Sequence, residues 1–335
     1  MERETNIERC KKYMKKQEML GTKTFEFRMN DANDKVIITK YIPDESEYRV
    51  IEIPSFVTSI DVIEQVGITV RSVFSDVKQS LKIIHKNNQI QNMSGIFCEF
   101  KGKKLDLSEF DTTNVRTLKR MFLRNENLEE LNLSGFDTSK VWNFTNMLGS
   151  CENLKEVDMS MFDTSNATLL NAMFARCHKL EKLDLRNFDT SNAITMENMF
   201  IDCAELREID VSSFNTSEVE NMQGMFCKCM SLKELNISNF DTSKVESMNR
   251  MFYNCLSLEG LNLSNFTADS LECMRDMFAE CVSLTKLDLS NFHPKLEDDE
   301  QESIGMFRNC REIELKSGSD IVNKLYKERF TGYFE

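Results

Sequence analysis

Residues 136–161 read FDTSKVWNFTNMLGSCENLKEVDMSM, and this stretch is one copy of a unit that recurs every 26 residues. The phenylalanine that opens the unit returns at a constant interval, as Phe110, Phe136, Phe162, Phe188, Phe214, Phe240, Phe266 and Phe292. A fixed period of this length is the signature of a repeat protein, in which each copy forms one structural unit. The sequence therefore predicts a stack of similar coils along most of the chain.

Each unit contains one segment with helical spacing and one with strand spacing. In the copy that begins at residue 240, apolar residues fall at helical spacing from Val245 to Cys255, which predicts a helix. The Asp-Thr-Ser segment before it supplies side-chain oxygens that accept amide protons, so we expect it to cap that helix. Leu261 and Leu263 then alternate with a polar residue, which predicts a short strand with one buried face.

A single unit cannot fold alone, because an isolated helix and strand would leave the flanks of their apolar residues in water. Stacking the units into a solenoid buries those flanks, with the strands in a parallel sheet and the helices in a second layer. Strands pair about 4.8 Å apart, whereas helices pack ~8–10 Å apart. We therefore predict an α/β solenoid with parallel strands on its concave side and helices on its convex side.

The repeat also resembles a known family. Residues 240–264, FDTSKVESMNRMFYNCLSLEGLNLS, are similar to the unit of the BspA-like leucine-rich-repeat proteins, which reads Phe-Asp-Thr-Ser-x-Val, Met-x-x-Met-Phe-x-x-Cys and Leu-x-x-Leu-x-Leu-Ser. The likeness extends from about Ile90 to Leu315. It implies a leucine-rich-repeat fold and a binding rather than catalytic role, because members of that bacterial family are known as adhesins and surface interaction proteins.

The ends of the chain lack the repeat, and solenoid ends need polar-faced caps. We predict an N-terminal α/β capping module in residues 1–85, the leucine-rich-repeat solenoid in residues 86–315 and a C-terminal capping helix in residues 316–335.

Local patterns support both caps. A charged stretch from Glu2 to about Leu20 has helical spacing, and two β-rich stretches on either side of residues 30–34 predict a hairpin. At the other end, Asp320 is expected to cap a closing helix that extends to Phe330.

The chain has 11 cysteines, and seven occupy one repeat position: Cys151, Cys177, Cys203, Cys229, Cys255, Cys281 and Cys310. A small apolar residue that fills the helical face explains this column. Neighbouring helices would hold these residues beyond the ~7 Å limit for a disulfide, so we expect free thiols and a reducing compartment. Cys227 and Cys229 form a lone Cys-x-Cys, which without a matching histidine predicts no zinc site.

A formal net charge of -13 argues against nucleic acid as a ligand, because nucleic-acid binders need a basic stripe. The N-terminus lacks the apolar core of a signal peptide, and no run is long enough to cross a bilayer. We expect a cytoplasmic protein, while the family resemblance implies a cell-surface location as the alternative.

Polar residues beside the strand leucines are the candidate binding site. Neighbouring residues on a strand face opposite ways, so these side chains should point outward from the strand wall. The partner-binding candidates are Glu130, Asn132, Glu156, Asp158, Lys182, Asp184, Arg186, Glu208, Asp210, Glu234, Asn236, Asn262, Lys286 and Asp288. They make the predicted wall predominantly acidic, with basic interruptions.

The regular Asp/Asn column within this set has two interpretations. Its members can be solvated or hydrogen-bonded scaffold residues, or they can contact a ligand. Calcium is a poor fit, because its sites bring six to eight oxygens to one point and each coil supplies one carboxylate. The less regular column from Glu130 to Lys286 is the better candidate for specificity.

No catalytic arrangement is predicted. His85, His178 and His293 lie in unrelated settings, and Gly-rich phosphate loops are absent, so we expect neither an enzyme nor a cofactor. The buried register of the Met-Phe pairs predicts core rather than a peptide receptor. Trp142, the single tryptophan, is a candidate interface residue.

Three functions fit these observations. The first is a non-enzymatic scaffold that binds another protein through its concave strand face. The second is an intracellular acidic inhibitor or immunity protein for a basic toxin or nuclease. The third is a surface adhesin exported without a visible signal. The sequence does not specify the partner or the oligomeric state.

Overall fold

The computed structural model describes residues 5–20, 25–29, 36–43, 46–54, 57, 59–60, 62–66, 69–72, 74–75, 77–86, 90–295 and 303–330. The chain divides into two compact units, Met1–Phe162 and Asp163–Glu335, here called unit 1 and unit 2. The three-part division expected from the sequence stays a prediction.

Unit 1 begins with the helix and hairpin that the sequence predicts. Its first elements are α1 (Asn6–Leu20), β1 (Phe25–Met29), β2 (Val36–Tyr41), β4 (Ser59–Ile60), β5 (Val62–Val66) and β6 (Thr69–Ser72). Strands β1 and β2 pair antiparallel, and β4 joins β2 in parallel, while β5 and β6 form a separate antiparallel pair. The turn residues 30–34 of the predicted hairpin lie outside the described residues.

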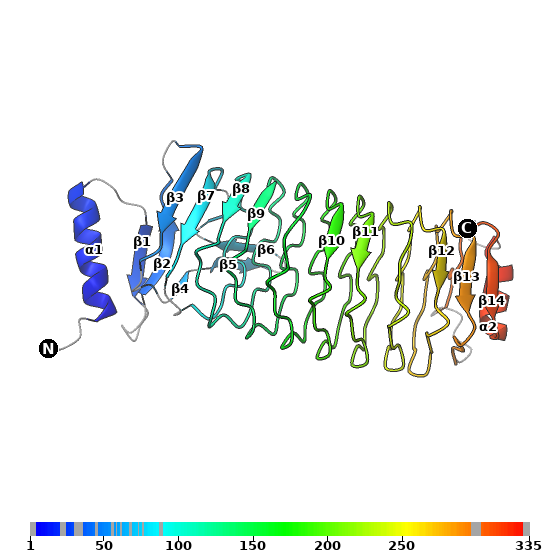
Figure 1. Cartoon of the computed structure of the whole chain (residues 1–335). Helices are drawn as coiled ribbons and strands as arrows, with labels where there is room; N and C mark the ends of the chain where they lie inside the picture. Colours follow the sequence, from blue (N-terminus) through cyan, green and yellow to red (C-terminus); the bar gives the residue numbers. More distant parts are fainter. Residues whose placement is uncertain are drawn as a thin grey trace. The chain divides into compact units, whose positions relative to one another are not determined.

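The repeat coils of unit 1 add a parallel sheet. It consists of β3 (Tyr48–Glu52), β7 (Ser80–Ile84), β8 (Lys104–Asp106) and β9 (Glu130–Asn132), which lie side by side in that order (Figure 1). The strand leucines are in register, since Leu81 pairs with Leu105 and Leu105 with Leu131. The predicted parallel pairing of successive repeats is therefore confirmed within this unit.

Unit 2 repeats the same arrangement. Its strands are β10 (Lys182–Asp184), β11 (Glu208–Asp210), β12 (Gly260–Asn262), β13 (Lys286–Leu289) and β14 (Glu314–Ser317), and the chain continues into α2 (Asp320–Lys327). Strands β10 and β11 pair in parallel, as do β12, β13 and β14. The closing helix is confirmed, but its cap is Ser319, whose hydroxyl accepts from the Val322 amide at 3.4 Å.

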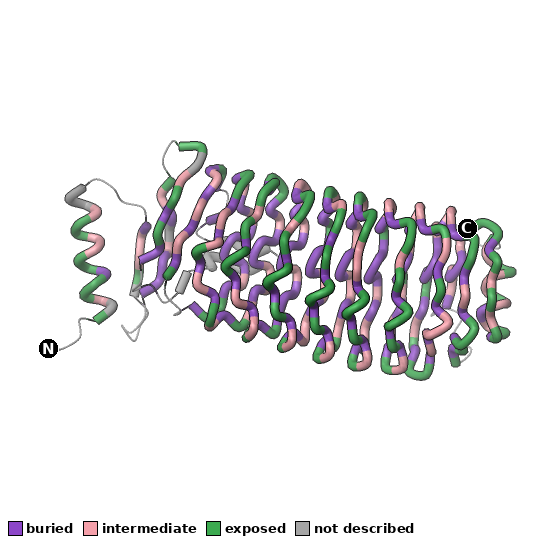
Figure 2. The backbone as a smooth tube through the Cα atoms, viewed as in Figure 1, coloured by how far each residue is buried: buried purple, intermediate pink, exposed green. Residues whose placement is uncertain are grey.

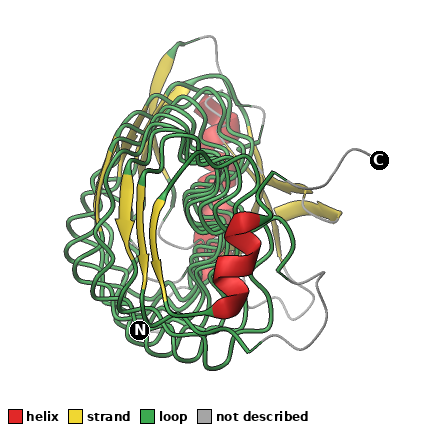
Figure 3. Ribbon diagram, turned by 90° about the vertical axis from the view of Figure 1, so that its right-hand side faces the viewer, coloured by secondary structure: helices red, strands yellow, loops and turns green. Residues whose placement is uncertain are grey.

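The segments opposite the strands are turns, so the predicted convex helices are wrong. Between residues 90 and 295, all of which are described, every coil has two left-handed residues four positions apart in this segment. Arg250 (φ 54°) and Asn254 (φ 59°) are one such pair. Left-handed residues interrupt the uniform right-handed geometry that an α-helix requires. The helices drawn in red in Figure 3 are α1 and α2, and the coil turns are green.

Backbone hydrogen bonds join these turns from coil to coil. The amide of Phe252 donates to the Met277 carbonyl at 2.9 Å, and that of Asn254 to the Ala279 carbonyl at 2.8 Å. Within a coil, the amide of Tyr253 donates three residues back to Arg250 at 3.1 Å. Backbone hydrogen bonds therefore set the spacing between coils at the turns as well as at the strands. The predicted concave and convex sides required packed helices, which are farther apart than paired strands, and these turns are not helices.

The two sides of the coils are named here for later use. The strand face consists of residues 258–264 and their equivalents at 26-residue intervals. The turn face consists of residues 248–255 and their equivalents.

Stacked aromatic rings and methionines fill the interior. In unit 2, Phe200 and Phe226 stack with centroids 5.5 Å apart and planes at 16°, and Phe252 and Phe278 with 5.5 Å and 4°. The methionine before each of these rings, Met251 for example, is fully buried, as predicted. Each such side chain contributes roughly 1.5–3 kcal/mol through burial. Figure 2 shows buried and exposed residues alternating along the coils.

The Asp-Thr-Ser segment links coils instead of capping a helix. Thr216 is buried, and its hydroxyl donates to the Asp241 carbonyl and accepts from the Asp241 amide, both at 2.8 Å. The Asp241 carboxylate accepts from the Ser243 amide at 2.9 Å and so closes a local turn. The Asp-Thr-Ser side chains were expected to accept amide protons at the start of a helix. They do accept backbone amide protons, but in a local turn and between neighbouring coils.

All 11 cysteines are free thiols, as predicted, and all but the half-buried Cys273 are buried. The Cys229 thiol donates to the Phe200 carbonyl at 3.2 Å, and Cys255 to the Phe226 carbonyl at 3.1 Å. Burial raises the pKa of the Cys229 thiol well above its ordinary value, so the thiol remains protonated. This column is part of the core and of the coil-to-coil bonding.

Candidate functional site

A shallow groove of about 950 Å³ follows the strand face of unit 2. It extends from β10 across β11 and the coil of residues 233–238 to β12. We call it the strand-face groove. Eight predicted binding residues line it, namely Lys182, Asp184, Arg186, Glu208, Asp210, Glu234, Asn236 and Asn262. The repeat therefore brings together side chains that are up to 80 positions apart in the sequence.

The other six predicted residues do not line this groove. Lys286 and Asp288 lie on β13 of the same unit. Glu130 and Asn132 lie on β9 of unit 1, while Glu156 and Asp158 are exposed in a segment of unit 1 without a strand. All six occupy the same repeat positions as the groove residues, but only the eight residues named above line the strand-face groove.

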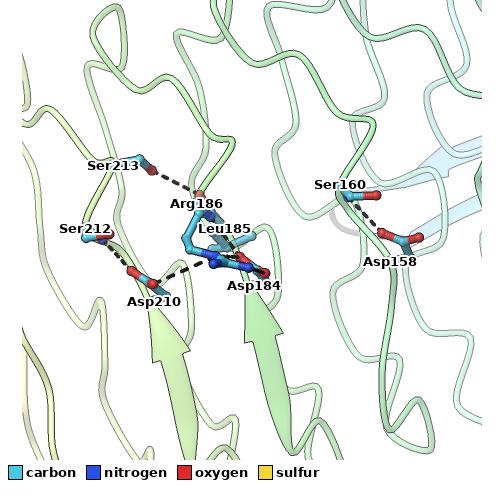
Figure 4. A network of polar contacts seen from close by, with 8 residues as sticks. All are labelled: Asp158, Ser160, Asp184, Leu185, Arg186, Asp210, Ser212 and Ser213. Carbon is cyan, nitrogen blue, oxygen red and sulfur yellow. Dashed lines mark hydrogen bonds and ion pairs between the residues drawn. The ribbon is translucent and has the colours of Figure 1, made fainter.

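The Asp/Asn column closes a turn at the end of each strand segment. In Figure 4 the Asp158 carboxylate accepts from the Ser160 amide at 2.9 Å, and Asp210 accepts from the Ser212 amide at 3.0 Å. The same bond forms at 2.9 to 3.2 Å in six further coils, where Asp106, Asn132, Asp184, Asn236, Asn262 and Asp288 accept from the residue two positions on. Such side-chain to backbone bonds favour Asp and Asn over other residues. The scaffold interpretation of this column accounts for its regularity.

Arg186 is the exception to this pattern. In the seven other coils the amide that completes the turn belongs to serine, and here it belongs to arginine. The Arg186 guanidinium donates to both carboxylate oxygens of Asp184, from Nε at 3.0 Å and from Nη2 at 2.6 Å, and lies 4.0 Å from Asp210 (Figure 4). These hydrogen bonds lower the pKa of Asp184 to about 2. The guanidinium is thus oriented by its own coil and remains exposed.

The groove is charge-balanced rather than predominantly acidic. Four cationic side chains line it, those of Lys182, Arg186, Arg207 and Lys233, and so do four carboxylates, those of Asp184, Glu208, Asp210 and Glu234. Lys182 and Glu208 are paired at 2.9 Å. Both residues are largely exposed, so this pair contributes little to folding stability.

Arg207 and Lys233 were not among the predicted site residues. Strict strand alternation assigns them to the side opposite the candidates, because each directly precedes a predicted groove residue. Both residues nevertheless line the groove, and the Arg207 guanidinium lies 3.9 Å from Glu181. Long basic residues flanking the strand segment are the signal that would have found them.

The residues that line the groove carry charged and polar groups that can bind a ligand. It offers exposed ammonium, guanidinium, carboxylate, amide and hydroxyl groups around apolar Leu183, Ile209 and Leu235. Among the described residues, no group of three or more His, Cys, Asp or Glu side chains could hold a metal ion. The described part of the chain also contains no helix long and apolar enough to span a membrane.

The repeat matches a family. Residues 68–182, 129–234 and 196–320 match the family described as "Mycoplasma protein of unknown function, DUF285". These overlapping matches extend from residue 68 to residue 320, which is more than half of the 335 residues. A comparison with curated proteins gives no significant match.

Solved structures of other repeat proteins are similar at low identity. A leucine-rich repeat protein from Bacteroides ovatus is 15% identical with a TM-score of 0.36, and 89% of each chain is covered. A leucine rich cell surface protein from Faecalibacterium prausnitzii is 14% identical with a TM-score of 0.34, over 92% of this chain and 97% of the other. The leucine-rich repeat protein of T. pallidum is 11% identical with a TM-score of 0.23, over 93% and 96%. The parallel coils and the family match lead to one conclusion: the chain belongs to the DUF285 family of BspA-like leucine-rich-repeat proteins.

Proposed function

We propose that this protein is a non-enzymatic scaffold and that another protein docks in the strand-face groove of unit 2. The observation that carries the proposal is the contrast between two neighbouring columns of the groove. The Asp/Asn column is used by the scaffold itself. The column two residues earlier changes from Lys182 to Glu208, Glu234 and Gly260 along the same wall. A recognition surface is expected to vary where its supporting backbone is constant.

The groove has the composition of an interface. Arg186 is pre-oriented by Asp184, so it loses little side-chain entropy when a partner binds. Arginine is also a residue type that often dominates binding energy. Leu183, Ile209 and Leu235 lie between the charged residues of the lining. A partner that presents both signs of charge complements this surface better than a uniformly basic one.

We also propose a reducing, cytoplasmic environment. Ten of the 11 cysteines are buried as free thiols, and in one repeat column Cys151, Cys203, Cys229, Cys255, Cys281 and Cys310 donate to a backbone carbonyl of the preceding coil. This arrangement suits a compartment in which thiols stay reduced.

Affinity capture from a lysate of the producing organism tests the docking proposal. Wild-type chain, Arg186→Ser and Glu234→Lys serve as baits, because Ser is the residue that other coils carry at the Arg186 position and leaves the turn intact. The control is Glu272→Lys, which makes the same charge change as Glu234→Lys at an exposed residue outside the groove. We expect the captured partner to lose about tenfold in affinity, roughly 1.4 kcal/mol, with either groove variant and to be unaffected by the control.

Two results would reject the proposal. One is a partner that binds all four chains equally. The other is a turnover reaction that requires residues of this chain. A partner whose affinity falls steeply with salt on the wild-type chain would instead favour the acidic-inhibitor function, because a charge-balanced groove should show a weak salt dependence.

A further inference from the structure

Two cavities open on the turn face of unit 2, and neither shares a residue with the strand-face groove. The larger, about 340 Å³, has Lys228, Arg250 and Tyr253 in its lining. The smaller, about 200 Å³, is lined by Arg250, Arg275, Asp276, Ile304 and Arg308. Arg250 belongs to both, so the two cavities adjoin at its side chain.

The lining is strongly cationic on a chain whose formal net charge is -13. The linings of the two cavities together contain four cationic residues, Lys228, Arg250, Arg275 and Arg308, and one carboxylate, that of Asp276 in the smaller cavity. Asp276 is only 7% exposed at its side chain, and its oxygens already contact Arg308 Nη2 at 3.0 Å and Arg250 Nε at 3.4 Å. Among the residues that the structure describes, no ion pair joins Lys228 or Arg275 to a carboxylate.

Arg250 is held in place before any ligand arrives. Its Nε contacts Asp276, and its guanidinium carbon lies 5.9 Å from the centre of the Tyr253 ring. Asp276 is itself fixed by Arg308, which also pairs with Glu280 at 3.2 Å. A planar guanidinium fixed in this way recognises carboxylate or phosphate oxygens through paired hydrogen bonds at a low entropic cost.

Gly224 lines the larger cavity together with Arg250. Its φ of +60° is the left-handed conformation of this turn position, where the neighbouring coils carry Asn198 and Arg250. The Asn198 side-chain oxygen lies where a Cβ at position 224 would stand, so glycine lets the Asn198 amide lie against this turn, and the buried Cys227 also lines the cavity. The amides of Asn198 and Gln223 add hydrogen-bonding groups to the rim. The larger cavity therefore offers amide groups as well as positive charge to a ligand.

We propose that these adjoining cavities bind an oxyanion, the carboxylate or phosphate group of a ligand or partner, with Arg250 as the central contact. Lys228 supplies a second cation in the larger cavity, and Arg275 supplies one in the smaller. Two sites separated by one shared guanidinium fit a ligand with two neighbouring anionic groups. This binding is independent of the strand-face groove and of its partner.

Isothermal titration calorimetry on the full chain tests the site with two probes, inorganic phosphate and a hexaglutamate peptide. Three variants are compared with wild type. Arg250→Gln removes the central charge. Gly224→Asn adds a side chain to the cavity wall and displaces the Asn198 amide without a charge change, and an asparagine already occupies the equivalent left-handed position at Asn198. Arg311→Gln is the matched control at an exposed arginine outside both cavities. Circular dichroism verifies that each variant is folded.

We expect saturable binding of at least one probe, weakened tenfold or more by both Arg250→Gln and Gly224→Asn and unchanged by Arg311→Gln. Tighter binding of phosphate assigns the site to a phosphorylated ligand, and tighter binding of the peptide assigns it to an acidic protein segment. Either result supports an oxyanion site. Absence of saturable binding overturns the proposal. Equal weakening by Arg311→Gln, or no effect of Gly224→Asn, also overturns it, because the attraction would then be diffuse.

Discussion

Acid should destabilise unit 1 through a single buried histidine. His85 is fully buried and lies against the Phe110 ring, with centroids 4.8 Å apart. In the part of the chain that the structure describes, neither ring nitrogen has a hydrogen-bond partner. Burial lowers the pKa of His85 from 6.5 to about 4, although the nearby Asp111 carboxylate opposes this shift. A charged imidazole is therefore disfavoured at this position.

The sign and size of the effect follow from proton linkage. Between about pH 4 and pH 6.5 the unfolded chain binds a proton at His85 that the folded chain does not, so the free energy of unfolding rises with pH in this window. A shift from 6.5 to about 4 corresponds to ~3 kcal/mol. This stabilisation is complete above the unfolded pKa of 6.5 and is lost as the pH falls toward 4.

Urea unfolding of wild type and His85→Phe at several pH values between 4 and 7.5 measures this term. Phe retains an aromatic ring beside Phe110 but cannot titrate. We expect the wild-type free energy of unfolding to fall by up to ~3 kcal/mol more than that of the variant across this range. The control is His178→Gln, in unit 2. Parallel pH profiles for wild type and His85→Phe would refute the reasoning.

Three further predictions concern the coils. Thr216→Val should lower the free energy of unfolding by about 2 kcal/mol in urea titrations, because it leaves the Asp241 amide and carbonyl without their hydrogen bonds to the threonine hydroxyl. Thr216→Ser keeps a hydroxyl and should lose much less stability. Equal losses in the two variants would contradict a stabilising role for these two hydrogen bonds. In the folded chain a thiol-reactive dye should modify Cys273 first, since all other thiols are buried, and Cys273→Ala should remove this phase of the reaction. Gly260→Lys should change stability by less than about 0.5 kcal/mol, because a Cβ there meets no atom closer than 3.8 Å; a large loss would show that the groove wall requires glycine.

The strands were predictable and the turns were not, for a physical reason. The Leu-x-Leu alternation of residues such as Leu261 and Leu263 has one structural solution when every coil repeats it, a parallel strand with a buried face. The spacing from Val245 to Cys255 has two solutions, because a chain of tight turns also buries residues three and four positions apart. Residue type at the left-handed positions was only a partial signal, since Arg124, Ala172 and Arg250 also occupy such positions. Asn146, Asn198, Gly224 and Gly305 all tolerate positive φ well.

The site was predictable in its location more than in its chemistry. Alternation along the strand placed eight candidates in the groove, including Arg186 and Glu208. It did not separate the Asp/Asn column, which completes turns, from the column that varies, because both face outward. It also missed Arg207 and Lys233, which line the groove although each precedes an outward-facing residue. The cationic cavities around Arg250 depend on which turn residues become neighbours, and the predicted helices would have placed those residues differently.

Hydrogen–deuterium exchange of the chain with its captured partner tests the strand-face docking most directly. We expect new protection of backbone amides in residues 182–186, 208–212 and 234–238, the segments that contribute most of the groove residues, and none on the turn face of the same coils. Protection confined to the turn face, or to residues 5–86 of unit 1, would contradict docking in the strand-face groove.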